Sequence, residues 1–202
     1  MCGIVGYVGH GPAGSRPLDV VLEGLARLEY RGYDSAGVAV AGPEGMSAVK
    51  RAGRLDNLRE ALAHSPLPAG TAAIGHTRWA THGGPTDENA HPHVSFDGAV
   101  AVVHNGIIEN YPELELELDR QGIFRRSETD TEIAAHHLAL EYAKDSDLLA
   151  AMCRLASRLQ GSFTLVGMAG DSEVVAARRN SPLVVGLGEG ENFLGSDVAA
   201  FV

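Results

Sequence analysis

The amino-acid sequence predicts an α+β fold in which helices cover antiparallel sheets. Apolar segments of strand length occur in both halves of the chain, and segments with helical periodicity lie between them. Several neighbouring strand segments are separated only by short turns, which join antiparallel strands rather than parallel ones. The 202 residues, 45% of them hydrophobic, suffice for one large domain with a buried core. Neither a repeat nor a linker divides them, so we expect one domain over residues 1–202.

The first half is expected to begin with a strand and a helix. Cys2–Val8 alternates small and β-branched residues between glycines, which is typical of a strand. From Pro17 onward, apolar residues recur at the spacing of one helical face. The helical face consists of Leu18, Val21, Leu22, Leu25 and Leu28. The further expected elements are the hairpin Ser35–Ala41 with Met46–Arg51, a short helix over 55–62, and the strands Thr71–Arg78 and Gly98–His104.

The segment Trp79–Asp97 separates the last two of these strands. It is rich in His, Gly and Pro and shows no periodicity. Long irregular segments inside a domain commonly carry function. We therefore expect this loop to contribute to a functional site.

The second half is expected to contain three helices followed by short strands. The helices are Tyr111–Gln121, Asp130–Ala143 and Leu148–Leu159, and the strands are Phe163–Ala169, Glu173–Ala177, Leu183–Leu187 and Phe193–Gly195. The patterns Asn110…Glu113 and Thr129…Glu132 predict capping boxes at the first two helices. Cys153 falls at helical spacing with Leu149 and Ala156, which predicts that its thiol packs in the core.

Charge and cysteine content narrow the possible partners and the compartment. The chain has 26 acidic and 16 basic residues, a net charge of −10, and its Lys and Arg residues are scattered. These features disfavour nucleic acid and anionic membrane as partners. There are two cysteines, Cys2 and Cys153, and neither lies in a Cys-x-x-Cys pair, which favours a cytoplasmic location. No apolar run approaches a membrane span, and no basic leader precedes an apolar stretch, so we interpret Met1 as a translation start.

Cys2 is the residue from which a chemical function can first be argued. Removal of Met1 would leave a thiol and a free α-amine on one residue. An α-amine has a pKa of about 7.7–8.0, so a usable fraction is neutral at cellular pH and can accept the thiol proton. Cys2 could then be both nucleophile and base, although a small apolar side chain in a buried strand explains an isolated Met-Cys start as well.

Three further sites would complete amide chemistry on an amino acid. Asn105-Gly106 follows an apolar strand and places an amide donor and a flexible backbone N–H at its end, which are the parts of an oxyanion hole. Arg78 could hold a carboxylate through two parallel hydrogen bonds, and Asp130 could receive an ammonium group. Taken singly, each of these residues is better explained by a turn, a surface ion pair or a helix dipole, respectively.

Ordered motifs along the chain are similar to those of a known family. They are Met1-Cys2-Gly3-Ile4-Val5-Gly6-Tyr7, Leu28-Glu29-Tyr30-Arg31-Gly32-Tyr33-Asp34-Ser35-Ala36-Gly37, Gly75-His76-Thr77-Arg78-Trp79-Ala80-Thr81-His82-Gly83, Asn89-Ala90-His91-Pro92-His93, Val103-His104-Asn105-Gly106-Ile107-Ile108-Glu109-Asn110 and Ser127-Glu128-Thr129-Asp130-Thr131. Near the end, Ser181-Pro182-Leu183-Val184 and Gly195-Ser196-Asp197 also match. The chain resembles the glutaminase domain of the glucosamine-6-phosphate synthase family (glutamine–fructose-6-phosphate aminotransferase, isomerising), a class II glutamine amidotransferase.

The resemblance implies a fold and a set of roles. The fold is the N-terminal-nucleophile α/β/β/α sandwich of four layers with two antiparallel sheets. The implied catalytic residues are Cys2 as nucleophile, with its α-amine as base, and Asn105 and Gly106 as the oxyanion hole. The implied glutamine-binding residues are Arg78, Asp130, Thr81 and His82, the last two in a closing loop, and Trp79, which is linked to ammonia passage.

The resemblance also implies partners beyond this chain. The substrate would be L-glutamine, and the ammonia would pass to a fructose 6-phosphate site in a sugar isomerase domain that these residues do not contain. The chain is therefore expected to be a piece of a longer, homo-oligomeric enzyme. On its own it should convert glutamine to glutamate and ammonia only. We expect neither a metal nor another cofactor.

Two alternatives of other classes remain open at this point. A metal-binding protein is suggested by the nine histidines, since His76, His82, His91, His93 and His104 fall within a short span. No recognised ligand spacing accompanies them, so we expect hydrogen-bonding roles in the loop instead. A regulatory domain that only binds an amino acid would retain Arg78 and Asp130 but would have no use for a free Cys2 amine.

Overall fold

A computed structural model of the chain describes residues 2–9, 17–43, 45–80, 83–170 and 172–202. Two sheets form its centre. The first has the strand order β3-β2-β4-β1-β10-β9, and the second has the order β5-β6-β7-β8. Every strand pairing recorded in the described residues is antiparallel, as the sequence predicts. The strands are β1 (Gly3–Gly9), β2 (Ser35–Gly42), β3 (Gly45–Ala52), β4 (Ala72–Arg78), β5 (His93–Val94), β6 (Val100–Ile108), β7 (Gly161–Ala169), β8 (Glu173–Arg179), β9 (Val184–Leu187) and β10 (Glu191–Gly195).

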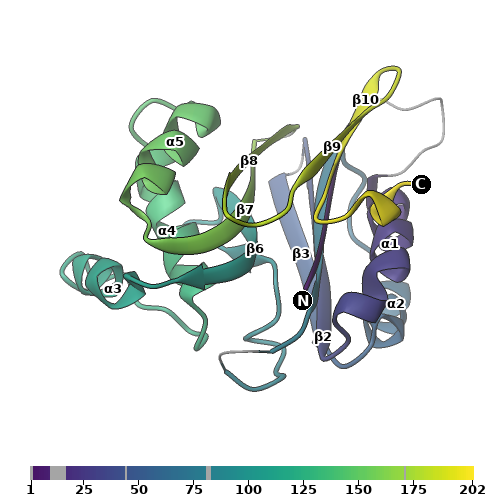
Figure 1. The fold of residues 1–202 in the computed structure, drawn as a ribbon, viewed down its shortest axis with the longest axis horizontal. Coiled ribbons are helices and arrows are strands. Elements are labelled where there is room, and N and C mark those ends of the chain that lie inside the picture. Colours follow the sequence, from purple (N-terminus) through teal and green to yellow (C-terminus); the bar gives the residue numbers. More distant parts are fainter. Residues whose placement is uncertain (1, 10–16, 44, 81–82, 171) are drawn as a thin grey trace.

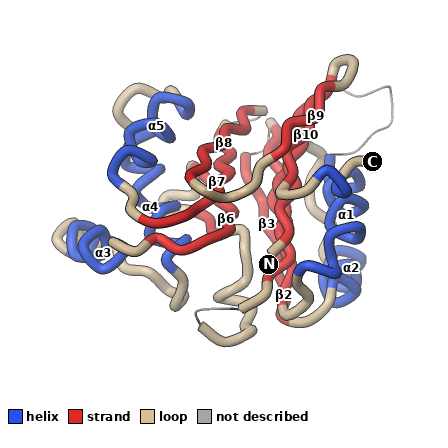
Figure 2. The backbone as a smooth tube through the Cα atoms, viewed as in Figure 1, coloured by secondary structure: helices blue, strands red, loops and turns tan. Residues whose placement is uncertain are grey.

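Helices cover the outer faces of both sheets. Two helices, α1 (Pro17–Leu28) and α2 (Leu55–His64), lie against the first sheet. The helices α3 (Tyr111–Asp119), α4 (Asp130–Tyr142) and α5 (Leu148–Arg158) lie on the side of the second sheet. Figure 1 shows the resulting order of helices, sheet, sheet and helices, and Figure 2 shows the same layers by secondary structure. The predicted α+β class and the four-layer α/β/β/α arrangement are confirmed. The remaining elements are the short 3₁₀ helices η1 (Glu29–Arg31) and η2 (Val198–Ala200).

Alternation along the strands builds three apolar layers. In β1, Val5 and Tyr7 pack with the helices of the first sheet, whereas Ile4 belongs to the layer between the sheets. In β6, Val102 packs toward α4, and Val103 faces the other sheet. The side-chain period of two in a strand produces this division. The layer between the sheets includes several alanines, which allow the sheets to approach closely: Ala39, Ala41, Ala72 and Ala101.

Helix α1 packs directly on the backbone of β4. A Cβ atom added at Gly75 would lie 2.5 Å from Val21 Cγ1 and 2.8 Å from Leu25 Cδ1. Both of these side chains are fully buried. The absence of a side chain at Gly75 therefore sets the distance between this helix and the strand that carries Arg78.

Two local predictions in the second half are wrong. Neither Asn110 nor Thr129 makes a side-chain cap hydrogen bond. Asn110 instead joins α3 to the end of α5 by donating to the Arg158 carbonyl (3.0 Å), and the Thr129 hydroxyl binds His93 and Ser127. In both cases the side chain binds a residue that is distant in sequence instead of the helix N-terminus that it was expected to cap.

Cys153 is exposed, which corrects the prediction that it packs in the core. The buried face of α5 is formed by Leu148, Ala151, Met152 and Leu155. Cys153 and Leu149 share a neighbouring face that points to solvent, and Leu149 is 58% exposed. The face predicted from Leu149, Cys153 and Ala156 is offset by one residue from the face that is buried. Packing against α4 buries the second face instead. None of the described helices is long and apolar enough to cross a membrane.

Replacing Gly75 with alanine should destabilise the fold. The new methyl group would overlap Val21, and overpacking of this kind costs about 1–3 kcal/mol. Val21→Ala removes the nearest clashing atom, although Leu25 Cδ1 remains close, so Gly75→Ala and Val21→Ala together should cost less than the sum of the single changes. Urea unfolding of the four proteins measures this coupling. Strictly additive losses would contradict the close contact.

Candidate active site

Cys2 lies beside the end of β4. The register pairs Gly3 of β1 with Thr77 of β4, which brings the preceding residue next to Arg78 and Trp79. The Trp79 N–H donates to the Cys2 Sγ atom at 3.2 Å. Burial raises the pKa of the Cys2 thiol, and the hydrogen bond from Trp79 only partly offsets this effect. The resting side chain is therefore a thiol, which needs a base before it can act as a nucleophile.

Asn105 and Gly106 reach Cys2 from the second sheet. The Asn105 Nδ2 atom donates to the Cys2 carbonyl oxygen at 3.1 Å. Both residues lie within β6, paired with Thr164 and Phe163 of β7, and not at the end of a strand as the sequence predicts. The strand continues to Ile108 because β7 offers a partner for each residue, a contact that local sequence does not reveal.

Gly106 interrupts the regular strand geometry. Its φ of 127° lies in a region that side chains disfavour, and a Cβ there would lie 2.0 Å from the Ser162 carbonyl oxygen. Only glycine fits this position. The backbone can therefore border the cavity beside Cys2 without a side chain in the way.

Arg78 and Asp130 lie around the same small cavity. Arg78 is the last residue of β4 and is 4% exposed, with its guanidinium donating to the carbonyls of Gly84 (3.2 Å) and Gly83 (3.4 Å). Asp130 is the first residue of α4, and its Oδ2 atom accepts from the Ile108 N–H at 2.8 Å. A basic side chain on a strand of the first sheet and an acidic side chain at the start of α4 thus border one space.

Two cavities meet at Cys2. The inner one, of about 40 Å³, is lined by residues that include Cys2, Arg78, Gly106 and Asp130. The outer one, of about 290 Å³, is lined by Cys2, Arg31, Trp79, Asn105, Gly106, Ile107, Ser181 and Pro182. Cys2 and Gly106 border both spaces.

The structure brings together six of the eight predicted site residues. These are Cys2, Arg78, Trp79, Asn105, Gly106 and Asp130. Thr81 and His82, and Met1 with them, lie outside the described residues. Trp79 is 49% exposed and meets Tyr33 edge-to-face, with ring centroids 5.5 Å apart. The indole therefore lies at the mouth of the outer cavity.

Buried histidines line the floor of the site. His91 Nε2 and His104 Nδ1 bind the Thr131 hydroxyl at 2.8 and 2.9 Å, and His93 Nε2 binds the Thr129 hydroxyl at 2.8 Å. These are the hydrogen-bonding roles expected of them. In the part of the chain that the structure describes, no group of three or more His, Cys, Asp or Glu residues is arranged to hold a metal ion.

The Asn89 and Glu128 side chains link the loop to α4, which sequence reasoning missed. Asn89 Oδ1 accepts from the Glu128 N–H, and Asn89 Nδ2 donates to Glu128 Oε2, both at 2.9 Å. The Asn89 amide also donates to the Gly84 carbonyl (3.1 Å), which Arg78 binds too. The pair therefore fixes the loop that holds Arg78 to the segment that leads to Asp130. Both residues stand in the motifs quoted above, but their separation in sequence hides the pairing.

Lys50 anchors the same loop from β3 and was also missed. Its ammonium donates to the carbonyls of Glu88 (2.9 Å) and Ala90 (2.8 Å). Burial lowers the pKa of Lys50 to about 8. A lysine on an edge strand gives no signal of this role in the sequence.

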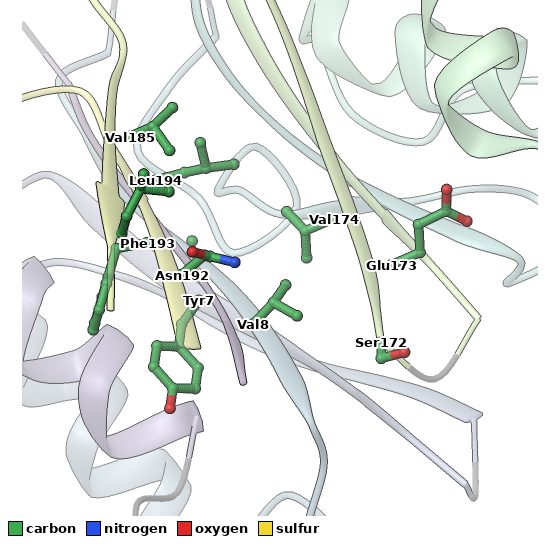
Figure 3. Close-up of a pocket in the computed structure, with 11 residues that line it drawn as sticks. Tyr7, Val8, Ser172, Glu173, Val174, Val185, Asn192, Phe193 and Leu194 are labelled. Atoms are coloured by element: carbon green, nitrogen blue, oxygen red, sulfur yellow. The ribbon is translucent and has the colours of Figure 1, made fainter. Parts of the chain in front are cut away.

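A separate cavity of about 380 Å³ lies at the other end of β1, between β10 and β8 (Figure 3). Val8, Val174 and Leu194 point into it, whereas the ring of Tyr7 points away. The residues lining it include no cysteine, histidine or arginine. The predicted site residues therefore lie at the Cys2 end of the strand and not at this cavity.

Comparison with known proteins shows the class. A family model described as glutamine amidotransferase domain matches residues 76–202. The chain therefore belongs to the glutamine amidotransferase domain family. The solved structure of glutamine phosphoribosylpyrophosphate amidotransferase from B. subtilis matches with a TM-score of 0.83 and 27% identity, over 99% of this chain and 43% of that one. This likeness confirms the expected N-terminal-nucleophile amidotransferase fold.

More similar relatives carry one name. The chain is 62% identical to the glutamine–fructose-6-phosphate aminotransferase [isomerizing] of Streptomyces coelicolor and 57% identical to that of Thermus thermophilus. Each match covers 100% of this chain but 32% of the relative. The chain thus spans about a third of the length of the curated relatives it matches.

The buried histidines should make stability strongly dependent on pH. Burial lowers the pKa of His76 to about 3 and holds the pKa of His91 and of His93 well below its ordinary value. In the unfolded chain each would titrate near a pH of about 6.5. Since the unfolded state then binds more protons, the free energy of unfolding should decrease as the pH falls below about 6.5, by roughly 4 kcal/mol per unit at about pH 5. Urea unfolding between about pH 5 and 7.5 measures how the free energy of unfolding changes with pH. A change that corresponds to uptake of less than one proton on unfolding would contradict the burial of neutral histidines.

Proposed function

We propose that this domain hydrolyses the side-chain amide of L-glutamine through a thioester on Cys2. The observation that carries the proposal is the position of Cys2, which borders a cavity shared with Arg78 and Asp130 while the Asn105 amide lies within 3.1 Å of its carbonyl oxygen. One small molecule could thus contact a nucleophile (Cys2), a carboxylate-binding group (Arg78), an ammonium-binding group (Asp130) and an oxyanion donor (Asn105). The membership of the glutamine amidotransferase family supports the choice of substrate.

The reaction takes place in two steps at Cys2. The sulfur attacks the amide carbon of glutamine, and the Asn105 side chain and the Gly106 N–H stabilise the negative oxygen that forms. The carbon–nitrogen bond breaks, the nitrogen takes up a proton, and ammonia leaves behind a glutamyl thioester. Water then attacks the thioester carbon, which releases glutamate and restores the thiol.

The base in this mechanism is the α-amine of Cys2 after removal of Met1. Burial keeps the Cys2 side chain protonated at rest, so a group must accept its proton when it attacks. A free α-amine titrates near a pH of about 7.7–8.0 and belongs to the same residue. While Met1 remains attached, that nitrogen is a peptide amide and cannot serve as a base.

Arg78 and Asp130 hold the α-carboxylate and the α-ammonium of glutamine. A guanidinium can donate two nearly parallel N–H groups to a carboxylate. Hydrogen bonds to the carbonyls of Gly83 and Gly84 hold the Arg78 guanidinium in place. Asp130 is fixed by the Ile108 N–H, which aligns its carboxylate. The family resemblance adds Thr81 and His82, which lie outside the described residues, to the proposed glutamine-binding residues.

In the longer protein the ammonia serves an acceptor domain. The relatives that are about three times as long are named glutamine–fructose-6-phosphate aminotransferase. We infer that a sugar isomerase domain follows residues 1–202 and converts fructose 6-phosphate to glucosamine 6-phosphate, in a homo-oligomer. The outer cavity supports this route, because it borders Cys2 and its lining includes neither Arg78 nor Asp130. The domain alone would release ammonia to solvent.

Cys2→Ala should abolish glutamate release, since no other group in the described site can form the thioester. Cys153→Ala is the matched control, because that thiol is exposed on α5 and lies outside the cavity. Glutamate release from glutamine is measured on protein whose loss of Met1 has been verified by intact mass. Turnover of Cys2→Ala within about tenfold of the unchanged protein would overturn the mechanism, since loss of a nucleophile costs many orders of magnitude.

A further inference from the structure

His76 is a buried side chain to which neither the sequence motifs nor the proposed mechanism gives a role. It lies on β4 two residues before Arg78 and has no exposed surface. Its Nε2 atom lies 3.0 Å from the Asn105 Oδ1 atom and 3.0 Å from the His104 carbonyl oxygen. This ring therefore crosses from the first sheet to the second and touches the side chain proposed as the oxyanion donor.

The partners fix the proton of this ring. Cys2 presents a carbonyl oxygen to Asn105, and a carbonyl only accepts, so the Asn105 amide must turn its Nδ2 group toward Cys2. Its Oδ1 atom then faces His76. Both neighbours of His76 Nε2 are acceptors, so this nitrogen carries the hydrogen. Burial lowers the pKa of His76 to about 3, and the ring remains neutral.

The unpartnered ring nitrogens agree with this assignment. Within the described residues, His76 Nδ1, His91 Nδ1 and His104 Nε2 are buried without a hydrogen-bond partner. Each is the nitrogen opposite the one that makes a bond, so each carries only a lone pair. An N–H group in such a place would be left without an acceptor. The ring hydrogens of this cluster thus all point at oxygen atoms.

The orientation of an asparagine amide is decided only by its partners. The amide oxygen and nitrogen have nearly the same size, and the terminal torsion has two broad minima. If the amide of Asn105 turned over, it would present an oxygen to the negative charge that develops on the substrate. That oxygen would repel the charge instead of stabilising it.

We propose that His76 is a positioning residue that holds the Asn105 amide with its N–H groups toward the substrate. This inference rests on the proposed function, because Asn105 has this task only if the site stabilises an oxyanion. His76 reaches the reacting atoms only through Asn105. It should therefore influence the chemical step and not the binding of glutamine, which the proposed function assigns to Arg78 and Asp130.

His76→Leu removes the donor and retains an apolar side chain of similar size. We expect kcat for glutamate release to fall by at least about tenfold. The fall should not exceed the loss of about 10²–10³-fold that follows removal of one oxyanion donor. The KM for glutamine should change by less than about threefold. His76→Gln can place an amide N–H near the original Nε2 atom and should recover most of the loss in kcat.

Buried His137 offers a matched control. It is 2% exposed, its Nε2 atom binds the Leu114 carbonyl at 2.9 Å, and it lines neither cavity at Cys2. His137→Leu should leave kcat unchanged although it removes the same kind of hydrogen bond. The rate at which iodoacetamide alkylates Cys2 should also be unchanged in His76→Leu, since alkylation uses the thiol but no oxyanion.

Asn105→Ala separates failure of this inference from failure of the proposed function. If Asn105→Ala retains full turnover, the oxyanion assignment is wrong. If Asn105→Ala loses turnover and His76→Leu does not, only the positioning role is wrong. In the Asn105→Ala background, His76→Leu should lower kcat by less than about twofold. An equal loss in both backgrounds, or no recovery in His76→Gln, would overturn the proposal.

Discussion

The pairing of β1 with β4 is the constraint on which the site depends. Because Gly3 is opposite Thr77, Cys2 is held beside the strand end that carries Arg78 and Trp79. Gly75 lets α1 press on β4, and strand β10 on the other side of β1 fixes the position of the N-terminal strand within the sheet. A terminal residue would ordinarily fray. Here the pairing of β1 within the sheet fixes the position of the Cys2 thiol.

The second constraint is the polar layer that joins the two sheets below the cavity. The imidazoles of His91, of His93 on β5 and of His104 on β6 bind the hydroxyls of Thr129 and Thr131 at the start of α4. Buried polar groups are tolerated when their hydrogens find acceptors, and the threonine hydroxyls and carbonyls supply them. The same contacts connect the strand of Asn105 with the helix of Asp130. Fold stability and site geometry therefore depend on one network, and we expect acid to weaken both.

Much of the fold could be predicted from local sequence, and the exceptions share one cause. The expected strands and helices are present because alternation and helical spacing report which face is buried. The capping patterns at Asn110 and Thr129 failed because distant partners captured their side chains. The strand through Asn105 extends further than expected because β7 pairs with it, and Cys153 is exposed because α4 selects the neighbouring face of α5. Local sequence patterns do not show which distant residues will pair with a strand, cover a helix face or bind a capping side chain.

The site itself was predicted through the resemblance more than through spacing, since Cys2, Arg78, Asn105 and Asp130 each have a simpler explanation alone. Their meeting at one cavity could not be read from positions that are so far apart in sequence. The most direct measurement of the central claim is peptide mapping by mass spectrometry of protein quenched in acid during glutamine turnover. The account predicts a glutamyl thioester on the peptide that contains Cys2. Turnover without any adduct on that peptide, or with the adduct on Cys153, would contradict it.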